Sequence, residues 1–133
     1  MATPANPIEA ISGRLRETSA LTLLIEQRSY PSKPTHDAPL PYVVFYRQSG
    51  GDGMNLNGRR QLRQHDVRVD VYAKSQEQAN AVLSAVVDQL DGWQEKPIGV
   101  QGCFAQGDAD EETPGDEIQL SGQTFSLWFK PQS

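Results

Sequence analysis

The chain has 133 residues and a formal net charge of −5, from 12 Lys and Arg residues against 17 Asp and Glu residues. Its length suits one domain, which we expect to span residues 1–133, and is too short for two. The pI near 4.9 argues against a dedicated nucleic-acid-binding protein, which would carry clustered basic residues, and the single Cys103 excludes an intramolecular disulfide and a multi-cysteine zinc site.

Neither a membrane-spanning helix nor a secretion signal is predicted. No apolar run approaches the roughly 18 residues that a membrane span requires, and the N-terminal residues lack the basic start and apolar centre of a signal peptide. We therefore expect a soluble protein that is cytoplasmic when made, with Cys103 as a small buried hydrophobic residue.

The N-terminal segment is predicted to be helical over about residues 7–16. Asn6 suits the N-cap and Pro7 the first helical position. Three apolar residues then recur at the spacing of one helical face: Ile8, Ile11 and Leu15. A short helical turn is expected around residues 19–24, after which a proline-rich loop is predicted, because four prolines halt regular structure: Pro31, Pro34, Pro39 and Pro41.

Two strands follow the prolines. A strand is predicted at residues 42–47, because residues 42–46 form an unbroken aromatic and β-branched run. This strand should be buried on both faces or nearly so. A glycine-rich loop then leads to a second strand that starts near Arg59. There the valines alternate with charged residues, so the valines should face a core and the charges water: Val67, Val69 and Val71 against Asp66, Arg68 and Asp70.

The best-defined helix is predicted after this strand. Ser75 and Gln78 have the spacing of a capping box, and Gly92 suits the C-terminal cap. Between them runs one apolar stripe that should cover the valine face of the sheet: Ala79, Val82, Leu83, Val86, Val87 and Leu90.

Two more strands are predicted at residues 98–106 and 118–129, joined by an acidic turn. The apolar phase of the last strand shifts across Ser121-Gly122, which indicates a β-bulge and a bend of the sheet. The acidic turn superficially resembles a calcium-binding loop, but Thr113 stands where that loop needs glycine and Pro114 follows it. A solvated hairpin tip is the better interpretation.

No catalytic or metal site is predicted. His36 lies among the prolines and His65 at a strand start, and neither belongs to a known metal or nucleophile motif. Both are expected to be ordinary surface histidines. The glycines at residues 50–53 lack the Lys and Ser or Thr of a phosphate-binding loop.

The only basic concentration comprises Arg59, Arg60, Arg63 and Arg68, with Arg47 opposite. It could meet nucleic acid, the acidic residues 108–117 of a neighbouring copy, or only water. Basic and acidic patches on one molecule suit head-to-tail pairing. The candidate residues for contact with another subunit or partner are therefore Arg47, Asp52, Asn55, Asn57, Arg59, Arg60, Arg63, Asp108, Asp110 and Glu112.

Three segments in this order resemble the tail completion family of long-tailed bacteriophages, the tail-to-head joining proteins that are related in fold to tail terminators. They are Leu40-Pro41-Tyr42-Val43-Val44, then Val67-Arg68-Val69-Asp70-Val71-Tyr72-Ala73, then Ser75 through Leu90-Asp91-Gly92. The resemblance covers most of the chain. Each segment also obeys generic strand and helix rules, so their order and spacing carry the recognition.

The resemblance implies an α+β fold, with a four-stranded mainly antiparallel sheet and helices packed on one face. It implies a virion structural protein without enzyme activity or cofactor, assembled in the host cytoplasm as a hexameric ring. Such a ring caps the tail tube, docks onto the head connector or completion protein at the head–tail interface, and leaves a channel through which DNA passes without specific binding. No membrane is involved.

Ring closure would also cover the edges of the sheet, and six copies would carry six times −5, or −30, which suggests an acidic lumen along which DNA slides. Two alternatives remain open at this stage. One is another neck or minor capsid component of a phage. The other is a small α+β ligand-binding or hydrolytic enzyme, which would need a pocket with convergent polar groups.

Overall fold

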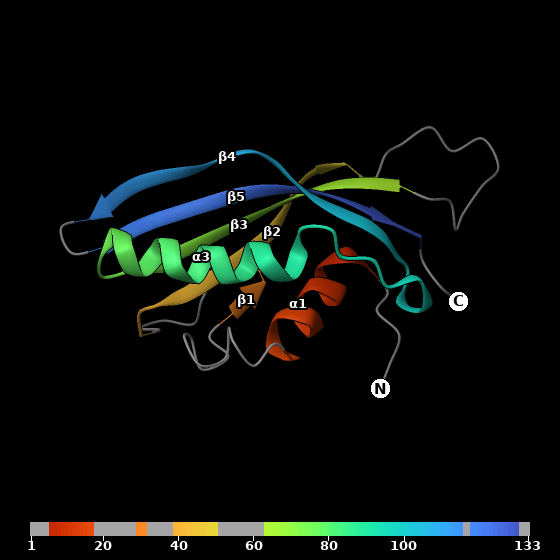
Figure 1. The fold of residues 1–133 in the computed structure, drawn as a ribbon, viewed down its shortest axis with the longest axis horizontal. Helices are drawn as coiled ribbons and strands as arrows, with labels where there is room; N and C mark the ends of the chain where they lie inside the picture. Colours follow the sequence, from red (N-terminus) through yellow and green to blue (C-terminus); the bar gives the residue numbers. More distant parts are fainter. Residues whose placement is uncertain (1–5, 18–28, 32–38, 51–62, 116–117, 131–133) are drawn as a thin grey trace.

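The computed structural model describes residues 6–17, 29–31, 39–50, 63–115 and 118–130 of the chain (Figure 1). Its elements in chain order are α1 Pro7–Glu17, β1 Ser29–Pro31, β2 Tyr42–Gly50, β3 Arg63–Ala73, α3 Gln76–Leu90, the 3₁₀ helix η1 Lys96–Ile98, β4 Val100–Gly115 and β5 Ile118–Phe129. None of the helices in these ranges combines the length and the apolar character that crossing a bilayer demands.

The strands form one sheet in the order β1-β2-β3-β5-β4. The four longer strands are antiparallel to their neighbours, as predicted, but a fifth strand, β1, pairs in parallel with β2 from Ser29↔Val43 to Pro31↔Phe45. The prediction of four strands, with Pro31 opening a loop, missed this short element. A three-residue strand has no periodicity to detect, and proline is tolerated at a sheet edge. The turn expected around residues 19–24 lies outside the described residues.

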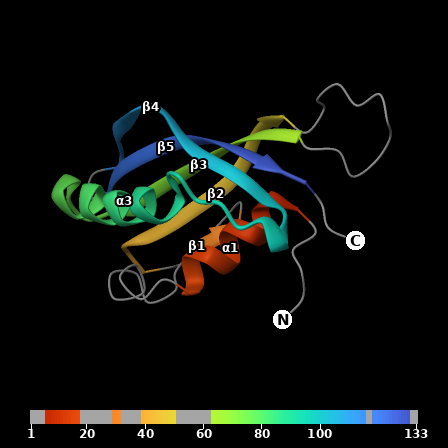
Figure 2. The ribbon, with the colours of Figure 1, turned by 45° about the vertical axis from the view of Figure 1, so that its right-hand side comes forward.

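Helices α1 and α3 lie on the same side of the sheet (Figures 1 and 2). Helix α3 packs across β5, β3 and β4, and α1 packs on β1 and β2. Their buried residues join one core with the inward side chains of the sheet, including Leu15, Phe45, Val69, Val86 and Phe125. The expectation of an α+β fold with helices on one face is confirmed. No helix of the described residues lies on the opposite side, which we call the helix-free face.

Helices α1 and α3 begin where the sequence places their caps. In α1 the backbone N–H of Glu9 donates to Asn6 Oδ1 at 3.0 Å. In α3 the backbone N–H of Gln78 donates to Ser75 Oγ at 3.1 Å. The Gln78 side chain accepts from the backbone N–H of Lys74 at 3.0 Å, one residue before the donor that a capping box uses.

The apolar stripe of α3 is buried as predicted, except that Val87 is only partly covered. The helix ends at Leu90, and Gly92 follows with a φ of +83°. That left-handed conformation is one that glycine adopts without steric cost, so the predicted C-terminal signal is confirmed.

The alternation in β3 is only half confirmed. Val67, Val69 and Val71 are fully buried under the helices. The charged residues between them occupy the helix-free face, but Asp70 is only 8% exposed, and Asp66 and Arg68 are half-buried. The prediction that these charges face water is therefore only partly confirmed, because Arg68 and Asp70 pair with each other and Asp66 accepts hydrogen bonds from two glutamine side chains.

The predicted acidic turn and β-bulge are both corrected. Strand β4 continues through the acidic residues to Gly115, which pairs with Ile118, so the connection is shorter than expected. The β5 register against β3 runs without a break past Ser121-Gly122. The irregularity lies instead in β4, where the register shifts between Gln106 and Asp110.

Polar residues on the core side of β5 explain the misleading phase change. Ser121 is fully buried, and its Oγ accepts from Gln76 Nε2 at 2.6 Å. Gln123 is also buried and donates through Nε2 to the Gln106 carbonyl at 2.7 Å, beside the irregular part of β4. Leu120 is buried on the helix-free face. The backbone therefore keeps its alternation while the apolar residues change sides.

Candidate functional site

The reactive side chains of the described residues do not converge. Within these ranges, no group of three His, Cys, Asp or Glu side chains is placed to hold a metal ion. Cys103 is fully buried in the core, as expected, and burial raises the pKa of its thiol to about 12. It is therefore a packing residue that stays protonated at neutral pH.

His65 is not the surface residue that the sequence suggested. It is 6% exposed on the core side of β3, opposite Leu127. Burial lowers the pKa of its imidazole, and the nearby charges of Arg47 and Arg63 lower it further. Its Nδ1 is the one buried side-chain nitrogen or oxygen of the described residues without a hydrogen-bond partner. His36 lies outside the described residues.

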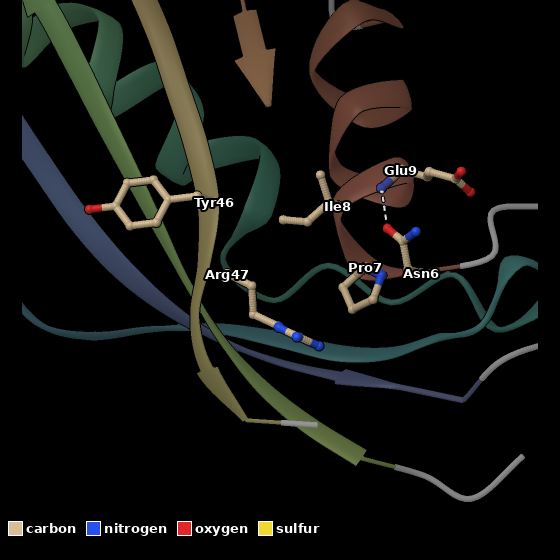
Figure 3. Close-up of a pocket in the computed structure, with 6 residues that line it drawn as sticks. All are labelled: Asn6, Pro7, Ile8, Glu9, Tyr46 and Arg47. Atoms are coloured by element: carbon tan, nitrogen blue, oxygen red, sulfur yellow. Dashed lines mark hydrogen bonds between the residues drawn. The ribbon is translucent and has the colours of Figure 1, made fainter. Parts of the chain in front are cut away.

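An open pocket of about 530 Å³ lies between the start of α1 and β2. Its lining comprises Asn6, Pro7, Ile8, Glu9, Tyr46 and Arg47 (Figure 3). The Arg47 side chain extends toward the start of α1, whereas the Tyr46 side chain points away from it (Figure 3). One acid and one base at the rim of an open hollow do not form the nucleophile–base–orienter arrangement of a hydrolase.

The predicted contact residues fall into separate places. Arg47 is exposed near the end of β2, and Arg63 begins β3. Asp110 and Glu112 are exposed on β4, at the far edge of the sheet, and Asp108 lies in the same strand. The other five lie outside the described residues: Asp52, Asn55, Asn57, Arg59 and Arg60. Their contact with a neighbouring copy stays a prediction.

Arg68 finds its acidic partners within its own chain. Its Nε donates to Asp70 Oδ1 at 2.8 Å and its Nη1 to Asp110 Oδ2 at 2.8 Å. Burial alone would lower the pKa of Arg68, but these two hydrogen bonds raise it above its ordinary value. The guanidinium thus ties β3 to β4 across the intervening strand β5.

Gly122 makes this bridge possible. It is the β5 residue that pairs with both Asp70 and Asp110. A Cβ atom at this position would lie 2.7 Å from Arg68 Cζ, and closer still to Arg68 Nη2 and Asp70 Oδ1. Because Gly122 has no side chain, the Arg68 guanidinium can lie directly over the β5 backbone at this position.

The edge of β4 is partly covered by the segment that follows α3. The covering contacts are Gly92 N–H to the Cys103 carbonyl at 2.6 Å, Ala105 N–H to Asp91 Oδ1 at 3.0 Å, and a backbone pair in which Glu95 N–H donates to Val100 O at 2.9 Å and Val100 N–H to Glu95 O at 3.2 Å. The rest of the strand has two register shifts and acidic residues, which also discourage pairing with another strand.

Sequence reasoning missed two exposed aromatic residues on the helix-free face. Phe104 is 51% exposed on β4 and Trp128 is 40% exposed on β5. Trp128 pairs with Gly102, and a Cβ on Gly102 would lie 3.0 Å from the Phe104 ring. The Phe104 and Trp128 rings therefore both lie next to Gly102 on this face. The signal was available for Trp128, because the alternation of Phe125, Leu127 and Phe129 puts it on the opposite face.

Comparisons with known proteins agree with this fold. The protein-family model described as tail completion protein gp17 matches residues 9–128. A chain from the virion of a native gene transfer agent particle superposes with a TM-score of 0.75 at 20% identity, covering 97% of this chain and 98% of that one. The gp17 protein of bacteriophage SPP1 superposes with a TM-score of 0.51 at 16% identity, covering 94% and 88%. No curated protein matches the sequence significantly.

Proposed function

The chain belongs to the family of tail completion protein gp17, and from this premise we propose that it caps the phage tail tube and joins it to the head connector. Family membership gives it a structural role in a phage tail. The observation that carries the proposal is the extent of the match, because residues 9–128 span the chain from α1 to β5. A partial match could reflect only a shared sheet and helix.

The working form is a homo-oligomeric ring, which we take to be a hexamer. It meets the tail-tube protein on one side and the head connector or completion protein on the other, and DNA passes through its channel. The protein assembles in the host cytoplasm and remains in the virion at the head–tail interface. A chain of similar fold comes from a gene transfer agent virion, which supports a location in a particle.

A non-enzymatic role is the better of the two classes. The pocket by Arg47 is open and its polar groups do not converge, and Cys103 is buried with a raised pKa. What the fold offers instead is a broad sheet face without a helix over it in the described part of the chain (Figure 2). A broad face suits a protein contact better than a small-molecule site.

The test is to delete the gene from the phage or particle that encodes the chain and examine the products by negative-stain electron microscopy. Tails of uncontrolled length and heads without tails are expected, with normal particles restored by the wild-type gene. Complementation by a chain with the exposed Gln94 changed to Ser is the matched control. Joined particles with tails of normal length in the deletion strain would refute the proposal.

The same experiment distinguishes the proposed role from that of another neck or minor capsid component. Finished tails of normal length beside unattached heads would indicate another neck component, and malformed heads would indicate a minor capsid protein. If the chain were an enzyme, the purified protein would instead catalyse a reaction, and a single substitution would abolish that activity.

A further inference from the structure

The helix-free face combines features that rarely occur together on a solvated surface. Tyr42, Tyr46 and Tyr72 are partly exposed there, and the Tyr42 and Tyr72 rings stack at 5.0 Å between centroids. Phe104 and Trp128 are the exposed large hydrophobic residues of the described chain, and both lie on this face. Aromatic residues are enriched at the centres of protein interfaces, where they carry much of the binding energy.

The face has the size that a stable interface needs. Strand β3 is 11 residues long, and four long strands lie side by side. At ~3.3 Å per residue and ~4.8 Å between strands, these dimensions give roughly 700 Å². A standard interface buries about 800 Å² on each partner, so one protein surface would cover this face almost completely.

The two edges of the sheet are less suited to association with another subunit than the helix-free face is. Hydrogen bonds with Gly92, Asp91 and Glu95 already cover the first half of the β4 edge, as described above. Pairing strand to strand along that edge would have to break them. The opposite edge is the three-residue strand β1, which offers few backbone groups. A neighbouring subunit should therefore bind on the helix-free face rather than at either edge of the sheet.

The charges of the face decide how two copies can meet. The described part of this face carries one guanidinium, Arg68, against four carboxylates: Asp66, Asp70, Asp110 and Glu112. Two such faces packed on each other would bring acids against acids, so a symmetric face-to-face dimer is disfavoured. A different surface of the second copy must lie opposite, and such a heterologous contact can close a ring.

The described chain offers the complementary charge elsewhere. Exposed basic residues stand away from this face, among them Arg47 on the core side of β2 and Lys96 in the 3₁₀ helix η1. We propose that the helix-free face, with Phe104 and Trp128 as its exposed aromatic anchors on β4 and β5, is the surface on which a second copy of this chain docks. This inference rests on the proposed ring and specifies its subunit contact.

The first test is sedimentation velocity of the full chain at increasing concentration, up to the solubility limit. The double variant Phe104→Ser and Trp128→Ser should raise the dissociation constant for self-association by about 30-fold or more, as expected for loss of interface hot spots. A matched control, Ala81→Ser with Asp88→Ser on the exposed side of α3, should leave it unchanged. Circular dichroism melts of both variants verify folding, since all four side chains are exposed.

The second test asks where the copies meet. In a Trp93→Phe background Trp128 is the only tryptophan, so acrylamide quenching reports its exposure alone. Quenching should fall as the protein associates. Association with unchanged quenching, or with no effect of the double variant, would overturn the inference while leaving a ring possible. Wild-type chain that stays monomeric throughout would also overturn it, and the gene-deletion experiment judges the tail role separately.

Discussion

The substitution Gly122→Ala probes the bridge between three strands. The added methyl group would lie 2.7 Å from Arg68 Cζ and closer to two polar atoms. These atoms belong to the side chains of Arg68 and Asp70, of whose side-chain surface only 15% and 12% is exposed. Contacts this short must be relieved by movement. Either the three strands shift, or the guanidinium leaves its place.

A shift of the strands and a displacement of the guanidinium should lower the free energy of unfolding by similar amounts. Forcing one extra carbon into a packed site costs about 1–3 kcal/mol, and losing charge-assisted hydrogen bonds at a nearly buried carboxylate costs about 1.5–3 kcal/mol. The two costs are alternatives, because the clash disappears once Arg68 swings out. We therefore expect a loss of about 2–3 kcal/mol in the free energy of unfolding, or roughly 8–12 °C in Tm for a chain of this size.

The assay is urea and thermal unfolding followed by circular dichroism, arranged as a double-mutant cycle with Arg68→Ala. In the Arg68→Ala background the alanine at position 122 has no guanidinium to displace, so its cost should fall substantially. Gly13→Ala is the control, and it should raise the free energy of unfolding rather than lower it. Nothing lies within 4 Å of a Cβ there, and Ala is favoured over Gly inside a helix by ~1 kcal/mol. Equal costs for Gly122→Ala in both backgrounds would refute the reasoning.

Three further predictions concern the core. Val86→Asp places a charge at a fully buried position of α3 and should abolish the cooperative melt by circular dichroism, whereas an unchanged melt would contradict the packing described. Because the pKa of His65 in the folded chain lies below the ordinary histidine value of 6.5, the unfolded chain binds the proton first. The free energy of unfolding should therefore be highest above about pH 6.5 and fall as the pH drops below it, and His65→Gln should reduce this slope in unfolding titrations. Cys103, with its pKa raised to about 12, should react with a thiol reagent at pH 8 only in denaturant, and rapid reaction of the native chain would show that the core opens there.

The candidate surfaces were only partly accessible to sequence reasoning. Trp128 could have been placed from the strict alternation around it, but Phe104 sits between two small residues in a segment without clear apolar periodicity. Five of the ten predicted contact residues lie outside the described residues, so the neighbour contact remains a proposal. The expectation for Arg68 changed most, because a residue grouped with other arginines by sequence turned out to be paired within the chain.

The sequence by itself determined the helices, the long strands and the buried valine face. Caps such as Asn6 and Ser75 act on a backbone group three residues away, and periodicity acts along one element, so both can be recognised from a short stretch of sequence. Only the tertiary structure decided which residues the helix-free face brings together. The Arg68–Asp110 contact joins residues 42 positions apart, and it exists because strand register places Gly122 between them. Register is a property of pairs of strands, and a single strand's pattern fixes only which side each residue faces.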